Sequence, residues 1–225
     1  MSTQLPPFPS FIQSIRSAID SNSETANKQL SDVLSLVFEP STTLSKNIVP
    51  ALLERIRNAS DERELPGNYA ILIDTAIGLV SSLPDDEKAF FIGAHPRIGE
   101  VKGLSAMSAA EQGQSASTSS DVTPTPPDVL RRLACLNAAY EARYPGLIYI
   151  TFVNGRTRAQ IRDELEEKLR EEGVLPRAEK TDGLEGIQPQ FKNSDAWRKE
   201  VERAICAVRD IAQSRLEKLS KANDV

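Results

Sequence analysis

The sequence predicts an all-α protein, and three observations lead to that prediction. Apolar residues recur three and four positions apart along most of the 225-residue chain, which is the spacing of one helix face. Proline and small polar residues interrupt these patterns, as they do at helix ends. A single stretch, residues 147–153 (LIYITFV), has the composition of a strand, and one strand cannot form a sheet. We therefore expect about eight helices in one compact domain over residues 1–225.

The periodic segments predicted to be helical are residues 23–38, 41–56, 68–83, 84–91, 126–144, 157–172 and 193–221. Residues 68–83 are apolar over much of their circumference, which favours a central helix buried on several sides. Pro50 lies inside the second segment, where Ser41 or Thr42 is a candidate cap. It predicts a break or kink, because proline lacks the N–H of a helical hydrogen bond. The strand-like residues 147–153 are interpreted as an extended buried connector or as the N-terminus of a helix.

Two segments lack apolar periodicity and are predicted to be polar surface loops inserted in the helical domain. Residues 115–125 are rich in serine and threonine. Residues 173–190 contain three glycines and two prolines. We expect both loops to face solvent.

The composition excludes several classes of function. The chain has 27 basic and 32 acidic residues, a formal net charge of −5, whereas a general nucleic-acid binder needs a basic surface. No apolar run approaches the roughly 18 residues of a membrane-spanning helix, so we expect no membrane partner. The N-terminus lacks the features of a secretory signal, and the last residues are not a peroxisomal tripeptide. A cytoplasmic location is the default expectation, and a peroxisomal one stays open.

Cysteine and histidine are scarce, which limits the chemistry available. Cys135 and Cys206 are too few for a disulfide framework and cannot form a zinc site by themselves. Both lie in apolar helical patterns and are interpreted as small buried thiols. The chain contains neither a dinucleotide-binding glycine motif nor a P-loop. Because His95 is the single histidine, a mechanism that needs two histidines within one chain is excluded.

His95 is the first candidate for chemistry. It precedes Pro96, which restricts its backbone away from the helical conformation, so a helix ending here would project the imidazole from a turn. An imidazole gives and takes protons near neutral pH, as general acid–base catalysis requires. The structural alternative is a histidine at a helix C-terminus that interacts with the free carbonyl groups.

Ser108 and Glu111 are the second candidate. Their S-x-x-E spacing matches a capping box, in which the serine side chain and the glutamate side chain each accept from the other residue's backbone N–H. The functional alternative directs the Glu111 carboxylate into the same cleft as His95. The two interpretations are compatible, because a cap would fix the position of Glu111.

Arg215 is the third candidate. It follows Val208 by seven residues and Ile211 by four, so it falls on the apolar stripe of the last predicted helix. A buried guanidinium is costly unless it meets a carboxylate or a ligand. The structural alternatives are an ion pair within the protein and a snorkelling side chain. Arg203 and Arg209 fall off the stripe and are expected to be solvated.

Five segments together resemble one known family. They are FEPST (38–42), AHPRIGE (94–100), SAAEQ (108–112), LNAAYEARYPGLIYITFVNGR (136–156) and IAQSRLEKL (211–219). In this order they resemble the 2-oxo-4-hydroxy-4-carboxy-5-ureidoimidazoline (OHCU) decarboxylases. The resemblance implies an all-helical lyase that needs no cofactor or metal and is usually a homodimer. It also implies that the enzyme follows uricase and 5-hydroxyisourate hydrolase in purine degradation. Its partner would be the small-molecule ureidoimidazoline, and its product S-allantoin.

The resemblance also implies which residues form the site. The catalytic residues would be His95, Glu111 and Arg215. The substrate-binding residues would be Pro96, Ser108, Gln112, Tyr149, Ile150, Thr151, Phe152 and Val153, the last five through backbone groups. The commoner family motif has an acid where this chain has Arg97, so any role of that acid cannot be transferred.

Two alternatives stay open beside this reading. One is a non-catalytic helical interaction or scaffold protein that shares the core pattern, and the other is a lyase for a related ureido compound. In the enzyme, His95, Glu111 and Arg215 should converge on one pocket, and Arg215→Met should not lower stability. In a scaffold, Arg215 should be bound to a structural acid and no pocket should exist.

Overall fold

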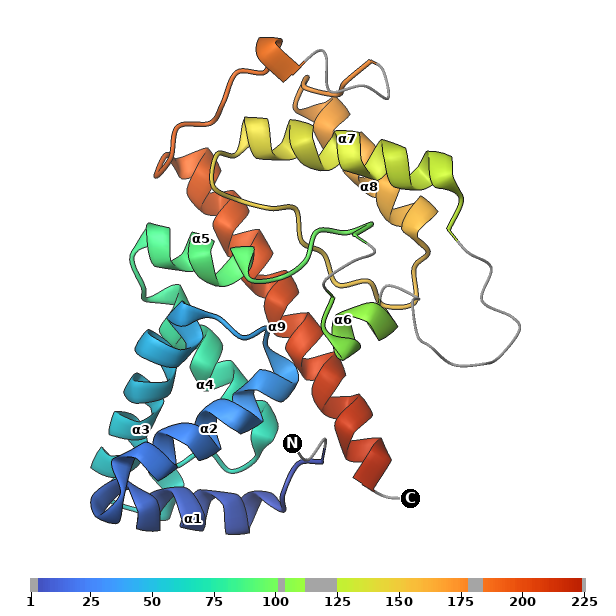
Figure 1. Cartoon of the computed structure of the whole chain (residues 1–225). Helices are drawn as coiled ribbons and strands as arrows, with labels where there is room; N and C mark the ends of the chain where they lie inside the picture. The colour runs from blue at the N-terminus through green and yellow to red at the C-terminus, as the bar shows by residue number, and fades with distance from the viewer. Residues whose placement is uncertain (1–3, 101–103, 112–124, 178–183, 224–225) are drawn as a thin grey trace. The chain divides into compact units, whose positions relative to one another are not determined.

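The computed structural model describes residues 4–100, 104–111, 125–177 and 184–223 (Figure 1). Within these ranges the chain is helical and contains no strand, which confirms the predicted all-α class. The α-helices are α1 (Phe8–Ser21), α2 (Ser23–Val37), α3 (Val49–Asn58), α4 (Tyr69–Ser81), α5 (Asp85–Gly93), α6 (Ala106–Glu111), α7 (Pro127–Arg143), α8 (Arg158–Glu171) and α9 (Asp195–Asn223). Shorter elements are the π-helical turn η1 (Leu44–Ile48) and the 3-10 turns η2 (Glu62–Glu64) and η3 (Leu184–Gly186). No helix in the described ranges has the length and apolar character needed to cross a membrane.

Contacts between residues divide the chain into two units. Unit 1 comprises Met1–Ala94 and Ile205–Val225, and unit 2 comprises His95–Ala204. Helix α9 therefore begins in unit 2 and continues into unit 1. The expectation of a single domain stays a prediction. Most of the first predicted loop and residues 178–183 of the second lie outside the described residues.

Several helices begin where their capping residues predict. Asn68 Oδ1 accepts a hydrogen bond of 2.9 Å from the backbone N–H of Ile71 at the start of α4. Thr157 and Gln160 form a capping box at the start of α8. Helix α1 is not among the predicted helices, although its buried residues have helical spacing: Phe11, Ile12, Ile15, Ala18 and Ile19.

The break predicted at Pro50 is a π-helical turn. Ser41 Oγ accepts a hydrogen bond of 3.0 Å from the backbone N–H of Leu44, where η1 begins. The backbone N–H of Val49 then bonds to the carbonyl of Leu44, which closes the wider turn. Pro50 lies in the first turn of α3, where a missing N–H costs no helical hydrogen bond.

Unit 1 is a group of packed helices. Helices α1, α2 and α3 pack against one another, and α4 packs against α3 and α5 (Figure 1). The C-terminal part of α9 is held to α4 by Arg209, which donates to Asp74 Oδ1 at 2.7 Å, and by Gln213, which donates to the carbonyl of Ala70 at 3.2 Å. Arg209 is exposed, as expected, and its hydrogen bond lowers the pKa of Asp74.

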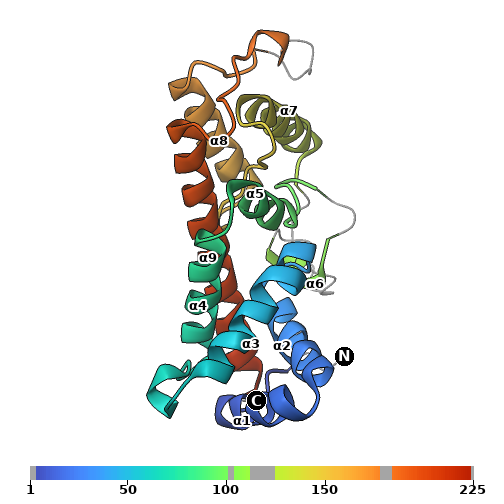
Figure 2. The same ribbon diagram turned by 90° about the vertical axis from the view of Figure 1, so that its left-hand side faces the viewer.

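Unit 2 is built around α7, α8 and the start of α9. Helices α7 and α8 pack against each other (Figure 1 and Figure 2). Trp197 at the start of α9 is fully buried, and its Nε1 donates to the carbonyl of Pro145 at 3.1 Å. Glu200 accepts hydrogen bonds from Tyr140 Oη at 2.7 Å and Lys168 Nζ at 2.9 Å. One buried carboxylate therefore joins the three helices.

Two side-chain expectations for α9 are wrong. Cys135 is buried, but Cys206 is exposed, because its position lies off the buried face of α9. Arg203 is not fully solvated, since only 35% of its side chain is exposed and its Nη1 donates to the carbonyl of Ile150 at 2.9 Å. A long arginine side chain can reach an acceptor beside the helix that periodicity alone does not reveal.

Candidate active site

His95 lies two residues beyond the C-terminal end of α5. Its backbone forms a bend before Pro96, and its side chain is buried, with 5% exposed. The helix therefore stops before the histidine, as the proline predicts. An imidazole in a turn and shielded from water is suited to proton transfer with a bound ligand.

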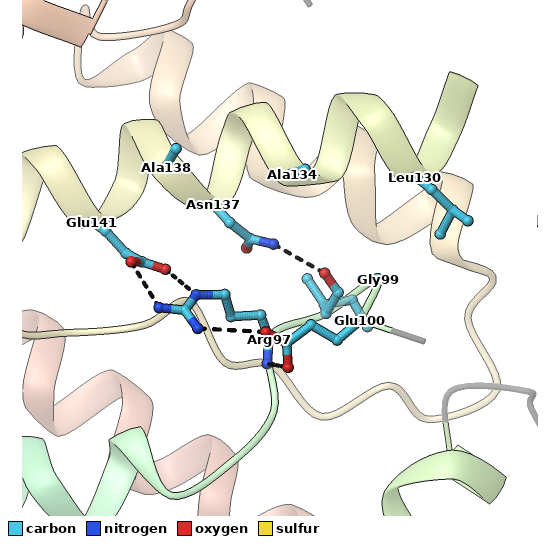
Figure 3. Close-up of a pocket in the computed structure, with 9 residues that line it drawn as sticks. Arg97, Gly99, Glu100, Leu130, Ala134, Asn137, Ala138 and Glu141 are labelled. Carbon is cyan, nitrogen blue, oxygen red and sulfur yellow. Dashed lines mark hydrogen bonds and ion pairs between the residues drawn. The ribbon is translucent and has the colours of Figure 1, made fainter. Parts of the chain in front are cut away.

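The residues that follow His95 are anchored to α7. Arg97 forms a two-point contact with Glu141, Nε to Oε1 at 2.5 Å and Nη2 to Oε2 at 3.0 Å (Figure 3). Asn137 Nδ2 donates to the carbonyl of Ile98 at 3.0 Å. The hydrogen bond to Glu141 raises the pKa of Arg97. Arg97 stands where the commoner family motif has an acid, and in this chain Glu141 is the carboxylate that pairs with it.

A cavity of about 240 Å³ lies between this segment and α7 (Figure 3). Arg97, Glu100, Asn137 and Glu141 supply its polar lining. Gly99 has φ +90°, and a Cβ atom there would lie 3.1 Å from Leu133 Cδ1, so the close approach to α7 requires glycine. None of the predicted catalytic residues is among the residues that line this cavity.

Helix α6 begins one turn earlier than the predicted capping box requires. Ser105 Oγ accepts a hydrogen bond of 3.1 Å from the backbone N–H of Ser108, so Ser105 is the capping residue. Ser108 lies inside the helix and is buried, with 3% exposed. The capping box of Ser108 and Glu111 is therefore wrong. Glu111 is the last described residue of α6 and is half-buried, and Gln112 lies outside the described residues.

Residues 147–153 form an extended connector between α7 and α8, which confirms the first of the two interpretations. Leu147, Ile148, Tyr149 and Ile150 are buried, and the next three residues are half-buried. The carbonyl oxygen of Ile150 accepts from Arg203, and those of Phe152 and Val153 accept from Arg156. By contrast, the backbone N–H groups of residues 148–153 donate no hydrogen bond to any residue that the structure describes. Buried N–H groups are rarely left unpaired, so the connector offers donors for a ligand.

The polar side chains of the connector are occupied within unit 2. Tyr149 Oη donates to Glu164 Oε1 at 2.6 Å, and Thr151 Oγ1 donates to the same oxygen at 3.2 Å. Burial raises the pKa of Tyr149, which keeps its hydroxyl protonated as a donor. Among the polar groups of the connector, the backbone N–H groups are therefore the candidates for a ligand, and substrate binding by residues 149–153 stays a prediction.

Arg215 lies in the part of α9 that belongs to unit 1, and 2% of it is exposed. The inward position predicted from periodicity is confirmed. Its Nη2 donates to Glu39 Oε1 at 2.9 Å, and its Nη1 donates to the carbonyl of Val37 at 3.3 Å. The structural ion pair, one of the two alternatives, is therefore present. Binding of substrate by Arg215 stays a prediction.

The predicted site residues come from both units. His95, Ser108, Glu111 and the connector belong to unit 2, and Arg215 belongs to unit 1. Their convergence on one pocket stays a prediction. Glu39 and Glu141, the carboxylates that bind Arg215 and Arg97, are not among the predicted site residues. Glu39 carried a usable signal, because it directly follows an apolar helix and stands inside the FEPST segment.

The ion pair replaces the expectation that Arg215→Met leaves stability unchanged. Both partners are buried, with 2% and 7% of their side chains exposed. Removing the arginine alone should lower the free energy of unfolding by about 3–5 kcal/mol, because the Glu39 carboxylate keeps its desolvation cost. Adding Glu39→Gln should recover part of this loss. Urea unfolding of the parent, both single variants and the double variant measures the coupling, and an Arg215→Met protein as stable as the parent would refute it.

The sequence of the chain matches the model of one known protein family. A family model described as OHCU decarboxylase matches residues 23–190, well over half of the chain. The matched range includes His95, Glu111 and the connector, and it ends before Arg215. No curated protein sequence matches the chain. The chain therefore belongs to the OHCU decarboxylase family, and it is a carboxy-lyase that acts on a small molecule in urate degradation.

Proposed function

We propose that the protein converts 2-oxo-4-hydroxy-4-carboxy-5-ureidoimidazoline to S-allantoin without a cofactor. The observation that supports this best is the connector, whose backbone N–H groups at residues 148–153 donate to none of the residues that the structure describes. The substrate carries a carboxylate and several carbonyl oxygens, all of which are hydrogen-bond acceptors. A row of N–H donors in a segment that is buried at residues 147–150 and half-buried at 151–153 suits such a molecule, because charged acceptors form the strongest hydrogen bonds.

The chemistry needs no electron sink beyond the substrate ring. The bond between C4 and the carboxylate breaks, CO₂ leaves, and the electron pair moves into the neighbouring C5=N system, whose nitrogen takes up a proton. The hydroxyl at C4 becomes a carbonyl as its proton is lost, and C5 gains a proton. The protein must therefore hold the carboxylate, manage the hydroxyl proton and direct protonation to one face of C5.

The proposed roles follow from these requirements. His95 is the acid–base group near the C4 hydroxyl, since a buried imidazole can accept and return a proton. Glu111 orients the imidazole or shares its hydrogen bond to the hydroxyl. Arg215 binds substrate oxygens with a guanidinium whose plane is set by its ion pair with Glu39.

Circular dichroism tests the proposal. Freshly oxidised urate is treated with 5-hydroxyisourate hydrolase, and the product is followed with and without this protein. We expect fast appearance of a single allantoin enantiomer, whereas uncatalysed decay gives a racemate. If the folded protein leaves the rate and the racemic outcome unchanged, the substrate assignment fails. A related ureido compound is then the next substrate to test.

His95→Asn should keep the fold and lower the rate by about 10²–10⁴-fold, because asparagine fits the site but does not transfer protons near neutral pH. The initial slope of the allantoin dichroism signal measures the rate, and far-ultraviolet dichroism checks the fold. A folded variant with the parental rate would remove His95 from the mechanism.

Glu111→Gln separates catalysis from helix stability. Because Ser105 caps α6, the substitution should change the free energy of unfolding by less than about 1 kcal/mol. The rate should nevertheless fall by about 10²-fold or more, since the carboxylate charge is lost. Glu167→Gln, which alters an exposed glutamate of α8, is the matched control. Equal rates for the two variants would contradict a catalytic role for Glu111.

The homodimer implied by the resemblance and the cytoplasmic location are also proposals. Neither is needed for the assay above. Sedimentation of the purified protein at several concentrations tests the dimer, and a constant monomer mass over that range would exclude it.

A further inference from the structure

We propose that Arg156 and Arg203 are positioning residues for the connector, residues 147–153. They bind its carbonyl oxygens, so that its N–H groups are presented as donors to carboxylate or carbonyl oxygens of the substrate. The identity of that substrate rests on the proposed function. Figure 1 shows that the connector doubles back from the end of α7 to reach the start of α8. No strand lies beside it in the part of the chain that the structure describes, so its carbonyl groups need other partners.

Arg203 approaches the connector from α9. Its Nη1 donates to the carbonyl of Ile150 at 2.9 Å, and its guanidinium lies 5.2 Å from the centre of the Tyr149 ring. Its Nε donates to Glu200 Oε1 at 2.8 Å. Burial lowers the pKa of Arg203, but Glu200 and nearby tyrosines raise it by more than burial lowers it. The pKa is therefore raised overall, and the guanidinium stays charged. Its Nη2 is buried and has no hydrogen-bond partner among the described residues, which leaves a donor beside the connector.

Arg156 reaches the connector because the chain turns sharply between Val153 and Arg156. Asn154 and Gly155 have φ values of 45° and 75°, and the backbone N–H of Arg156 bonds to the carbonyl of Val153 at 2.9 Å. Two successive residues with positive φ form a tight reversal, for which Asn-Gly is the favoured pair. The turn sends the Arg156 side chain back along the connector.

The Arg156 guanidinium then occupies several acceptors at once. Its Nε donates to the carbonyl of Val153 at 3.1 Å, and its Nη2 donates to the carbonyl of Phe152 and to Thr151 Oγ1. Its Nη1 pairs with Glu164, which also accepts from Tyr149. The planar fork of arginine serves all of these acceptors, and the single ammonium group of lysine does not.

These contacts change what the connector offers to a ligand. A guanidinium that donates to a carbonyl oxygen polarises the whole peptide group. The N–H of the next residue, which belongs to the same peptide group, therefore becomes a stronger donor. Arg203 acts in this way on the N–H of Thr151, and Arg156 on the N–H of Val153. In an extended chain, N–H groups two residues apart point to the same edge, about 7 Å apart. The connector therefore presents a pair of strengthened donors, suited to two oxygens of an anionic ligand.

Substitution by lysine tests the proposal, because it keeps the charge and removes the fork. Arg132→Lys is the matched control, since Arg132 also pairs with a carboxylate, Glu166, and donates to a backbone carbonyl, that of Pro176, away from the connector. Arg156→Lys and Arg203→Lys should each raise KM for freshly generated ureidoimidazoline by about tenfold or more, with kcat changed by less than about threefold. Arg132→Lys should leave KM within about twofold of the parent. His95→Asn should show the opposite division, with kcat lowered.

Amide hydrogen exchange provides a readout without substrate. In Arg156→Lys and Arg203→Lys, the N–H groups of residues 148–150, which burial shields from water, should exchange about tenfold faster than in the parent, because the connector loses its anchors. In Arg132→Lys they should exchange at the parental rate. The proposal would be overturned if Arg156→Lys and Arg203→Lys both kept the KM and the amide exchange rates of the parent. It would also be overturned if Arg132→Lys raised KM as much as they do. If the parent does not convert the ureidoimidazoline, the proposed function fails, and the exchange rates still decide whether the two arginines position the connector.

Discussion

Unit 2 depends on one constraint, the burial of an extended segment in a protein whose described part has no sheet. Residues 147–153 cross the unit without a neighbouring strand, so no ladder of backbone hydrogen bonds can form. Arginine side chains from α9 and from the turn after Val153 take the place of a strand for three carbonyl groups. The N–H groups receive no such substitute within the described residues, which gives the segment its donor character.

The arginines require compensation in turn, because even a partly buried cation is costly without an anion. Glu164 and Glu200 provide it, and each also accepts a tyrosine hydroxyl, from Tyr149 and Tyr140. Burial raises the pKa of both tyrosines, so their hydroxyls stay protonated and donate. A network of this kind holds its members in fixed positions, since the loss of one leaves others unsatisfied in a medium of low dielectric constant.

The same arrangement of arginine and carboxylate occurs twice more, once beside a residue proposed for catalysis and once at such a residue. Glu141 holds Arg97, which lies two residues after His95, and Glu39 holds Arg215. A guanidinium held by a protein carboxylate has little side-chain freedom left to lose when a ligand binds. The ion pair of Arg215, which by itself fits a scaffold protein, is therefore compatible with the decarboxylase that the family match identifies.

The sequence by itself determined the helical class, most helix ends and the inward position of Arg215, because capping residues and apolar periodicity are local signals. It placed the start of α6 wrongly, because Ser105 and Ser108 are both suitable caps and only packing selects between them. Tertiary structure alone decided that Glu39 meets Arg215 and that Glu141 meets Arg97. Glu39 is 176 residues from Arg215 in the sequence, and no local pattern joins them. A strong charge interaction fixes such a pair only after the fold has brought the two side chains together.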